Sequence, residues 1–307
     1  MELRNRDRPL EIRRVLLITL VLNLLASASK IFYGYFIHSV AIVAEGFHSM
    51  FDGISNVAGL VGIRFSSYPP DEEHPYGHRK IESVLTIFVG AVMFVTCLEI
   101  FRKVYDSLVH KQEIAVSAVS FVLMAGTLVV NIFVALYEKR KGKKLNSEFL
   151  LADARHTQCD IYSTIGVIIS LILVRLGITY ADTIVGALVG VLVAKAGFDI
   201  LKESAAILVD KRQLDTALIN KIVCSIDGVT GCHKIRTRGT NSTIFLDLHV
   251  MVNPLLTVES AHRIAHVAEE NIRGRIPEII DIVVHIEPAT DPPEADWICK
   301  GKDNVEF

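Results

Sequence analysis

The chain has 307 residues, of which 51% are hydrophobic, and a mean hydropathy of +0.41. These values exceed what a soluble globular protein usually shows, so they exclude that class and indicate a membrane protein. The formal net charge of −2 indicates little by its size, because the distribution of charge along a membrane protein matters more than the sum.

Six apolar stretches account for the hydropathy, and each is close to the roughly 20 residues that cross a bilayer core. They lie near residues 15–33, 40–63, 81–101, 115–136, 149–175 and 181–206. The first stretch is long and lacks a small-residue cleavage pattern, so we do not expect a cleaved signal peptide. The sequence therefore predicts an α-helical membrane domain with six transmembrane helices at residues 1–208.

Positive charge falls mainly on one side of these stretches. Thirteen Lys and Arg residues lie in the N-terminal arm and in the loops after the second and fourth stretches, against five on the other side. The positive-inside rule then predicts a multi-pass protein of the cytoplasmic (inner) membrane with both termini in the cytoplasm. The KRKGKK run at 139–144 could also attract anionic membrane lipid, although setting the topology is the simpler account.

Two apolar stretches each contain a His-x-x-x-Asp pair, His48 with Asp52 and His156 with Asp160. Residues four apart lie on one helix face, and ionisable groups inside membrane helices mark functional sites. At 1.5 Å per residue, we place His48 and Asp52 about 13 and 20 Å from the outer face, and His156 and Asp160 about 16 and 10 Å from it. Four N and O ligands at one depth match a tetrahedral divalent metal site, provided that the two helices are neighbours. The alternative is buried polar pairing within each helix.

Several charged residues lie beside these pairs. Glu45 and Asp153 precede the two histidines by three residues, and either carboxylate could orient its histidine from outside the ligand shell. For Asp153 we favour a charge pair with Arg155, and for Glu45 both interpretations stay open. Lys30, near the outer end of the first stretch, is expected to extend toward the membrane interface.

The loop after the second stretch reads SSYPPDEEHPYGHRK and contains Asp71, His74 and His78. One carboxylate and two imidazoles make three protein ligands and leave room for water or exchange. A solvated acidic loop with incidental histidines explains the same residues equally well.

Composition changes after about residue 202, and a small α+β domain is predicted at 209–288. Its periodicity indicates a helix over 215–225, strands over 232–238 and 242–252, a helix over 258–275 and a strand over 281–287, with the helices on one sheet face. The tail at 289–307 is rich in Pro, Asp and Glu and is expected to be disordered. Five cysteines without a CxxC predict neither a disulfide framework nor a zinc ribbon, and we expect the cytoplasmic thiols to be reduced.

Histidine is frequent in this domain. His249, His285 and Glu287 occupy exposed-type strand positions, His233 opens a strand, and His262 and His266 lie four apart on a helix. Imidazole and carboxylate suit zinc and its neighbours, so a second metal cluster is one interpretation. A polar sheet face used for dimer contacts is the other.

Three segments, AEGFHSMFD, DEEHPYGHRKIES and ADARHTQCDIYSTIGV, carry a resemblance to the cation diffusion facilitator family over roughly residues 12–288. The resemblance implies six transmembrane helices, a cytoplasmic ferredoxin-like domain, and a homodimer that exchanges cytoplasmic Zn²⁺ or a similar divalent ion for protons. We do not expect an enzyme, because no nucleophile, cofactor loop or catalytic triad stands out in the sequence, and we expect neither an organic cofactor nor a nucleic-acid partner.

The same resemblance assigns residues by position. The transport site would be His48, Asp52, His156 and Asp160, and the loop site Asp71, His74 and His78. A regulatory cluster would comprise His233, His249, His262, His285 and Glu287, and Lys80 with Asp210 would form a charge pair. Members with Asp in place of His48 are often linked to manganese or iron, so His48 favours Zn²⁺, with Co²⁺, Cd²⁺, Mn²⁺ and Fe²⁺ as alternatives. The rival function is a non-transporting metal sensor or assembly scaffold.

Overall fold

A computed structural model describes the chain except for residues 1, 37–39, 110–117, 177–180, 290–298 and 300–307. Within the described helices, some further side chains, including those of residues 40–49, 51, 52 and 54, lie outside the description. The chain divides into two compact units, Met1–Ala205 and Ala206–Phe307, and each is described by itself.

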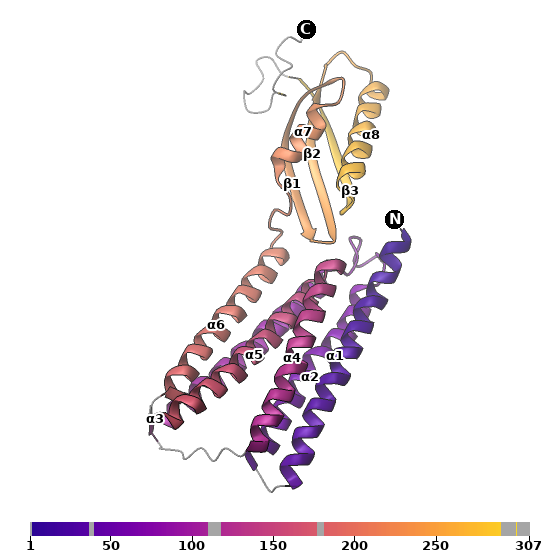
Figure 1. The fold of residues 1–307 in the computed structure, drawn as a ribbon. Helices are drawn as coiled ribbons and strands as arrows, with labels where there is room; N and C mark the ends of the chain where they lie inside the picture. Colours follow the sequence, from indigo (N-terminus) through magenta and orange to yellow (C-terminus); the bar gives the residue numbers. More distant parts are fainter. Residues whose placement is uncertain (1, 37–39, 110–117, 177–180, 290–298, 300–307) are drawn as a thin grey trace. The chain divides into compact units, whose positions relative to one another are not determined.

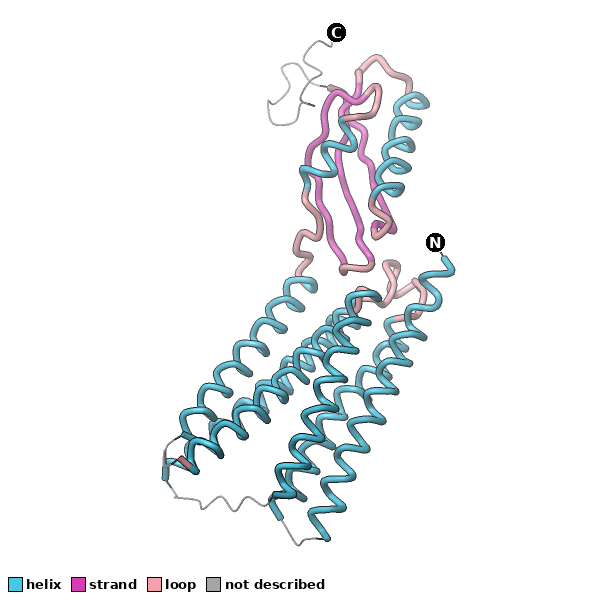
Figure 2. The backbone as a smooth tube through the Cα atoms, in the orientation of Figure 1, coloured by secondary structure: helices cyan, strands magenta, loops and turns pink. Residues whose placement is uncertain are grey.

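The first unit is a bundle of six long helices (Figures 1 and 2). They are α1 (Glu2–Phe36), α2 (Val40–Ser66), α3 (Lys80–Val109), α4 (Ala118–Leu145), α5 (Glu148–Arg175) and α6 (Ala181–Leu208). The shortest has 27 residues and is therefore about 40 Å long, enough to cross a bilayer core. Among the described residues, three segments combine this length with strong hydropathy: Arg8–Tyr33, Lys80–Asp106 and Thr183–Leu208.

Helices α2 and α5 adjoin in this bundle. A Cβ added to Gly59 of α2 would collide with the ring of Phe149, which is fully buried near the start of α5. The end of α2 thus lies beside the start of α5, so the two helices run antiparallel. This adjacency is the condition under which the two His-x-x-x-Asp pairs can converge.

The start of α1 is joined to α3 and to the turn between α4 and α5 by Arg8. Its guanidinium donates from Nε to the Leu145 carbonyl (2.7 Å) and from one terminal nitrogen to the Asn146 carbonyl (2.9 Å) and to Glu82 Oε2 (3.0 Å). Ser147 donates a short hydrogen bond to the other oxygen of Glu82. Both charged side chains are at least nine-tenths buried, so this buried ion pair fixes one end of the bundle.

The second unit has the predicted order of helix, strand, strand, helix and strand: α7 (Thr216–Cys224), β1 (Val229–Thr240), β2 (Thr243–Val252), α8 (Val258–Arg275) and β3 (Ile279–Pro288). Asp215 caps α7 by accepting from the Ala217 N–H, and Thr257 caps α8 by accepting from the Ser260 N–H. The sheet order is β1-β2-β3, with β1 antiparallel and β3 parallel to β2. The predicted fold class is confirmed, and β1 and β3 are longer than their hydrophobic alternation indicated.

The two faces of the sheet differ. Leu246, Leu248 and Val250 on β2 are buried against both helices, where they share a core with Ala268 and Ile272 of α8. His249 alternates with them, so it points to the opposite face. The sheet therefore separates an apolar, helix-covered face from a face that carries imidazoles.

The expectation of reduced cysteines is wrong for one pair: Cys224 and Cys299 form a disulfide. Cys299 is buried against the core of the second unit, and its N–H donates to the Thr230 carbonyl (3.2 Å). Seventy-five positions separate the two cysteines, and tertiary packing brings them together, which sequence spacing could not indicate. The rest of the predicted disordered tail, 290–298 and 300–307, lies outside the described residues.

Candidate metal centre

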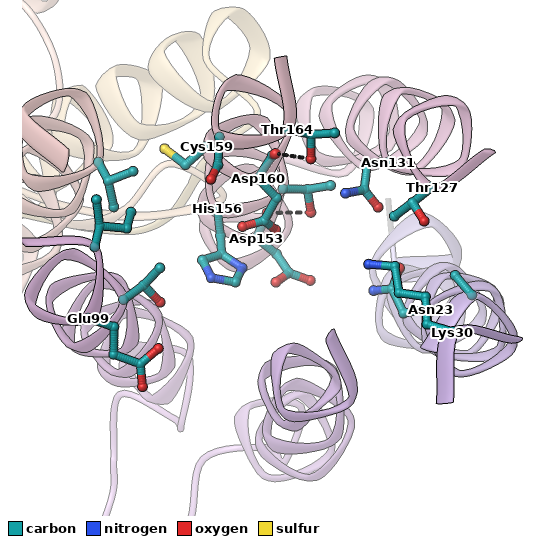
Figure 3. Close-up of a pocket in the computed structure, with 16 residues that line it drawn as sticks. Asn23, Lys30, Glu99, Thr127, Asn131, Asp153, His156, Cys159, Asp160 and Thr164 are labelled. Carbon is teal, nitrogen blue, oxygen red and sulfur yellow. Dashed lines mark hydrogen bonds between the residues drawn. The ribbon is translucent and has the colours of Figure 1, made fainter. Parts of the chain in front are cut away.

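His156 and Asp160 on α5 line a cavity of about 120 Å³ in the first unit. Figure 3 shows Asn23 and Lys30 of α1 and Thr127 and Asn131 of α4 facing them. His156 is only 3% exposed, and its Nε2 makes no hydrogen bond within the part of the chain that the structure describes. A buried imidazole nitrogen without a partner is costly, so this atom is available for a ligand such as a metal ion.

The other half of the predicted site lies on α2, where the side chains of Glu45, His48 and Asp52 are outside the described residues. The backbone levels can still be compared, because Gly59 contacts Phe149 across the antiparallel helices. Counting back from residue 59 to 52 and forward from 149 to 156 covers the same seven residues, about 10 Å along each axis. Asp52 thus lies at the level of His156, and His48 lies at the level of Asp160.

Two expectations for neighbouring charges are wrong. Arg155 donates to Glu203 of α6 (2.8 Å), so it pairs with a different helix instead of with Asp153, whose carboxylate is buried in the cavity wall. Lys30 is only 6% exposed and lines the same cavity, so it does not extend toward the membrane interface. Neither orientation could be read from the sequence, because both depend on which helix packs beside the residue.

The predicted loop site is assembled by a compact turn. Asp71 Oδ1 accepts from the His74 N–H (2.6 Å) and lies 3.2 Å from His74 Nδ1, while Oδ2 lies 3.4 Å from His78 Nε2. Gly77 permits the turn with a φ of +78°, and its N–H donates to the His74 carbonyl (2.8 Å). The hydrogen bond from the His74 backbone lowers the pKa of Asp71 below its usual 3.8, so the carboxylate is ionised at neutral pH. Its ligand atoms and those of both histidines lie within 4.8 Å of one another and could hold a divalent cation.

A second cluster lies on the imidazole face of the sheet and has residues from all three strands. Glu287 of β3 reaches His233 Nε2 of β1 (2.6 Å) with one oxygen and His249 Nδ1 of β2 (2.6 Å) with the other. His285 Nε2 lies 3.7 Å from Glu287. Partial burial by itself raises the pKa of Glu287, but the hydrogen bonds from His249 and His233 outweigh it and hold that pKa below its usual 4.5. Three convergent N and O atoms within 4.8 Å make this a candidate metal centre.

The structure does not bring His262 into this cluster within one chain. His262 lies on α8, which packs against the apolar face of the sheet, and its Nε2 lies 3.0 Å from Nε2 of His266. The sheet therefore stands between His262 and His249. Sequence position could not indicate this, because it does not tell which face of the sheet a helix covers.

Two family profiles match the chain: "Cation efflux transmembrane domain" at residues 16–209 and "Cation efflux protein, cytoplasmic domain" at residues 212–289. The chain belongs to the cation diffusion facilitator family. Efflux of divalent metal cations across a membrane is the activity of this family, so at this level of detail the chain is a transporter.

Several relatives of this cation diffusion facilitator span almost its whole length. An uncharacterised transporter of Methanocaldococcus jannaschii is 32% identical and covers 90% of this chain and 98% of its own. The manganese efflux protein MneS of Bacillus subtilis is 31% identical over 89% of this chain and 94% of its own, and the cation-efflux pump FieF of Cronobacter sakazakii is 29% identical over 92% and 94%. Among solved structures, a MamM CTD variant is 29% identical and covers 24% of this chain and 89% of its own, with a TM-score of 0.23.

Proposed function

We propose that the protein exports Zn²⁺ from the cytoplasm by antiport with protons, with His48, Asp52, His156 and Asp160 as the transport site. The observation that carries the proposal is the buried Nε2 of His156, which makes no hydrogen bond among the described residues and lies in a polar cavity that Asp160 also lines. The matching backbone levels of the pairs on α2 and α5 support convergence of all four ligands.

The ligand chemistry supports proton exchange. A metal ligand must be deprotonated to bind, and imidazole loses its proton near neutral pH. Metal binding from the cytoplasm therefore releases protons, and protons entering from the outside favour metal release. The antiport follows if the site is open alternately to the two sides.

Zn²⁺ is proposed because two imidazoles and two carboxylates suit a tetrahedral site. Mn²⁺ is the second candidate, because relatives of the chain are named manganese efflux proteins. Fe²⁺, Co²⁺ and Cd²⁺ fit the same donors less specifically.

We further propose a homodimer in the cytoplasmic membrane, with both termini in the cytoplasm. The site of Asp71, His74 and His78 and the cluster of His233, His249, His285 and Glu287 would bind cytoplasmic metal and favour one arrangement of the dimer. A contribution of His262, and the Lys80–Asp210 charge pair, stay predictions.

Flux in proteoliposomes under an imposed pH gradient tests the transport proposal. We expect Zn²⁺ flux that requires the gradient and falls at least about tenfold in His156→Ala and Asp52→Ala. His266→Ala is the matched control, because it removes an exposed imidazole outside the transport site. Flux of Mn²⁺ alone would replace the metal, and flux in His156→Ala equal to wild type would refute the site. Absence of all flux from folded, metal-binding protein would favour the sensor or scaffold.

A further inference from the structure

One lysine is buried in the wall of the candidate transport cavity. Lys30 of α1 is 6% exposed and lines the cavity that His156 and Asp160 also line. Asn23 and Ala26 line it too, so residues at positions i, i+3 and i+7 form one stripe of α1 on the cavity side. Figure 3 shows this stripe facing the polar side chains of α5. Lys30 therefore brings a basic group to the site where a cation is expected to bind.

The position of Lys30 along α1 does not force it inward. It lies three residues, about 4.5 Å, from the end of the apolar span Arg8–Tyr33. A lysine so near the end of a membrane helix ordinarily extends its flexible stem to the interface, where water solvates the ammonium group. Burial removes that water, and a charged side chain stays buried only where other groups compensate its charge. The cavity must therefore offer negative charge to Lys30.

Three carboxyl groups of the cavity supply this compensation. Glu99 of α3 and Asp153 and Asp160 of α5 line the same cavity as Lys30, and none of these four residues is without an interaction partner. Lys30 is the only Lys or Arg among the described residues that line the cavity. The basic residue of α5 closest to the aspartates, Arg155, is bound to a carboxylate of α6. The positive charge available to the cavity carboxylates from the described lining is thus that of Lys30.

We propose that Lys30 is a tethered cation that competes with the divalent ion for the cavity carboxylates. The ammonium group and the metal ion have charges of the same sign and bind the same kind of oxygen, so in one small buried space each weakens the binding of the other. Lys30 thereby lowers the affinity of the cavity for the ion and favours release of the ion after transport. A monovalent cation has less charge with which to displace the ammonium group, so Lys30 also favours divalent ions. This role rests on the proposed transport site.

Titration of the full-length protein with Zn²⁺ alone tests the competition. The background protein carries Asp71→Ala and His249→Ala, which remove ligands of the other two candidate metal centres. Lys30→Met removes the charge but keeps a side chain of similar length, and it should bind Zn²⁺ at least about tenfold more tightly than the background. Lys30→Arg keeps the charge and should stay within about threefold of the background. Lys141→Met is the control, because it removes a lysine charge from the same unit outside the cavity.

Stability measurements separate this competition from a merely structural role. Without metal, Lys30→Met should unfold at a lower denaturant concentration than the background, because the cavity carboxylates have lost their cation. Saturating Zn²⁺ should then raise the unfolding midpoint more in Lys30→Met than in the background, since tighter binding stabilises the folded state more. A purely structural lysine would lower the midpoints with and without Zn²⁺ by the same amount, and that result would overturn the proposal. Lys30→Gln, whose amide can still donate to a carboxylate, replaces Lys30→Met in all measurements if the latter does not fold.

Flux in proteoliposomes tests the effect on release. Lys30→Met should transport Zn²⁺ with a lower KM and a lower kcat, because the ion is held more tightly and leaves more slowly. Zn²⁺ binding that depends on His156 but has the same affinity in Lys30→Met would overturn the role of Lys30 and leave the transport site standing. Equal Zn²⁺ affinity in the background and in the same protein with His156→Ala would refute the transport site, and the competition with it.

Discussion

Replacing Arg8 by Met should destabilise the helical unit, because the buried Glu82 then loses the cation that lies 3.0 Å from it, although Arg79 is also close enough to attract it. Arg8 and Glu82 are 3.0 Å apart, and their side chains are only 9% and 5% exposed. Removing one partner of such a buried pair typically costs about 3–5 kcal/mol, since the remaining charge stays desolvated. The carbonyls of Leu145 and Asn146 lose their donor in the same substitution.

A double-mutant cycle separates the interaction energy of Arg8 and Glu82 from the energy lost through poorer packing. In Arg8→Met combined with Glu82→Gln, the side chain that lost its cation is neutral, and Ser147 can still donate to the amide oxygen. We therefore expect the double variant to recover roughly 1–3 kcal/mol relative to the sum of the single variants. Lys141→Met is the control, since it breaks a partly exposed pair between α4 and α1, with Glu11, and should cost no more than about 1 kcal/mol.

The assay is reversible unfolding of the detergent-solubilised full-length protein by denaturant, followed by a helical signal. A cost for Arg8→Met no larger than that of Lys141→Met would show that the Arg8–Glu82 pair is solvated. Strict additivity of the two single substitutions would show that the side chains do not interact energetically. Either result would refute the reasoning.

Three further predictions concern the second unit. The folded pKa of Glu287 is held below its unfolded value near 4.5. Its contribution to stability should therefore be complete above pH 4.5 and lost as the pH falls through the folded pKa. Glu287→Gln should remove this pH-dependent part of the acid unfolding profile. Closing a loop of 75 positions by the disulfide should contribute about 4.5 kcal/mol on the chain-entropy account, so Cys299→Ser should lower stability to that of the reduced wild type. An equal loss of stability on reducing the Cys299→Ser variant would contradict the assignment. In calorimetry, His249→Ala should weaken Zn²⁺ binding by the sheet cluster at least about tenfold. His262→Ala should leave the Zn²⁺ affinity of a monomeric preparation unchanged. An equal loss of Zn²⁺ affinity in both variants would place His262 in the cluster.

The sequence by itself determined the features that depend on short-range pattern. Apolar runs of about 20 residues predicted the helical membrane domain, and alternation in β2 predicted a sheet with one buried face. Residues 258–275 were predicted as a helix and form α8 with those bounds. The motif segments around His48, His74 and His156 indicated the family, and the comparisons confirm it.

Only the tertiary structure decided how distant segments meet. It turns Lys30 into the cavity, pairs Arg155 with Glu203 and joins Cys224 to Cys299. Sequence periodicity tells which residues share a face of one helix, but it does not tell which other helix that face contacts. A charge in a buried position is governed by its neighbours across that contact, so its partner becomes known only when the helices are packed.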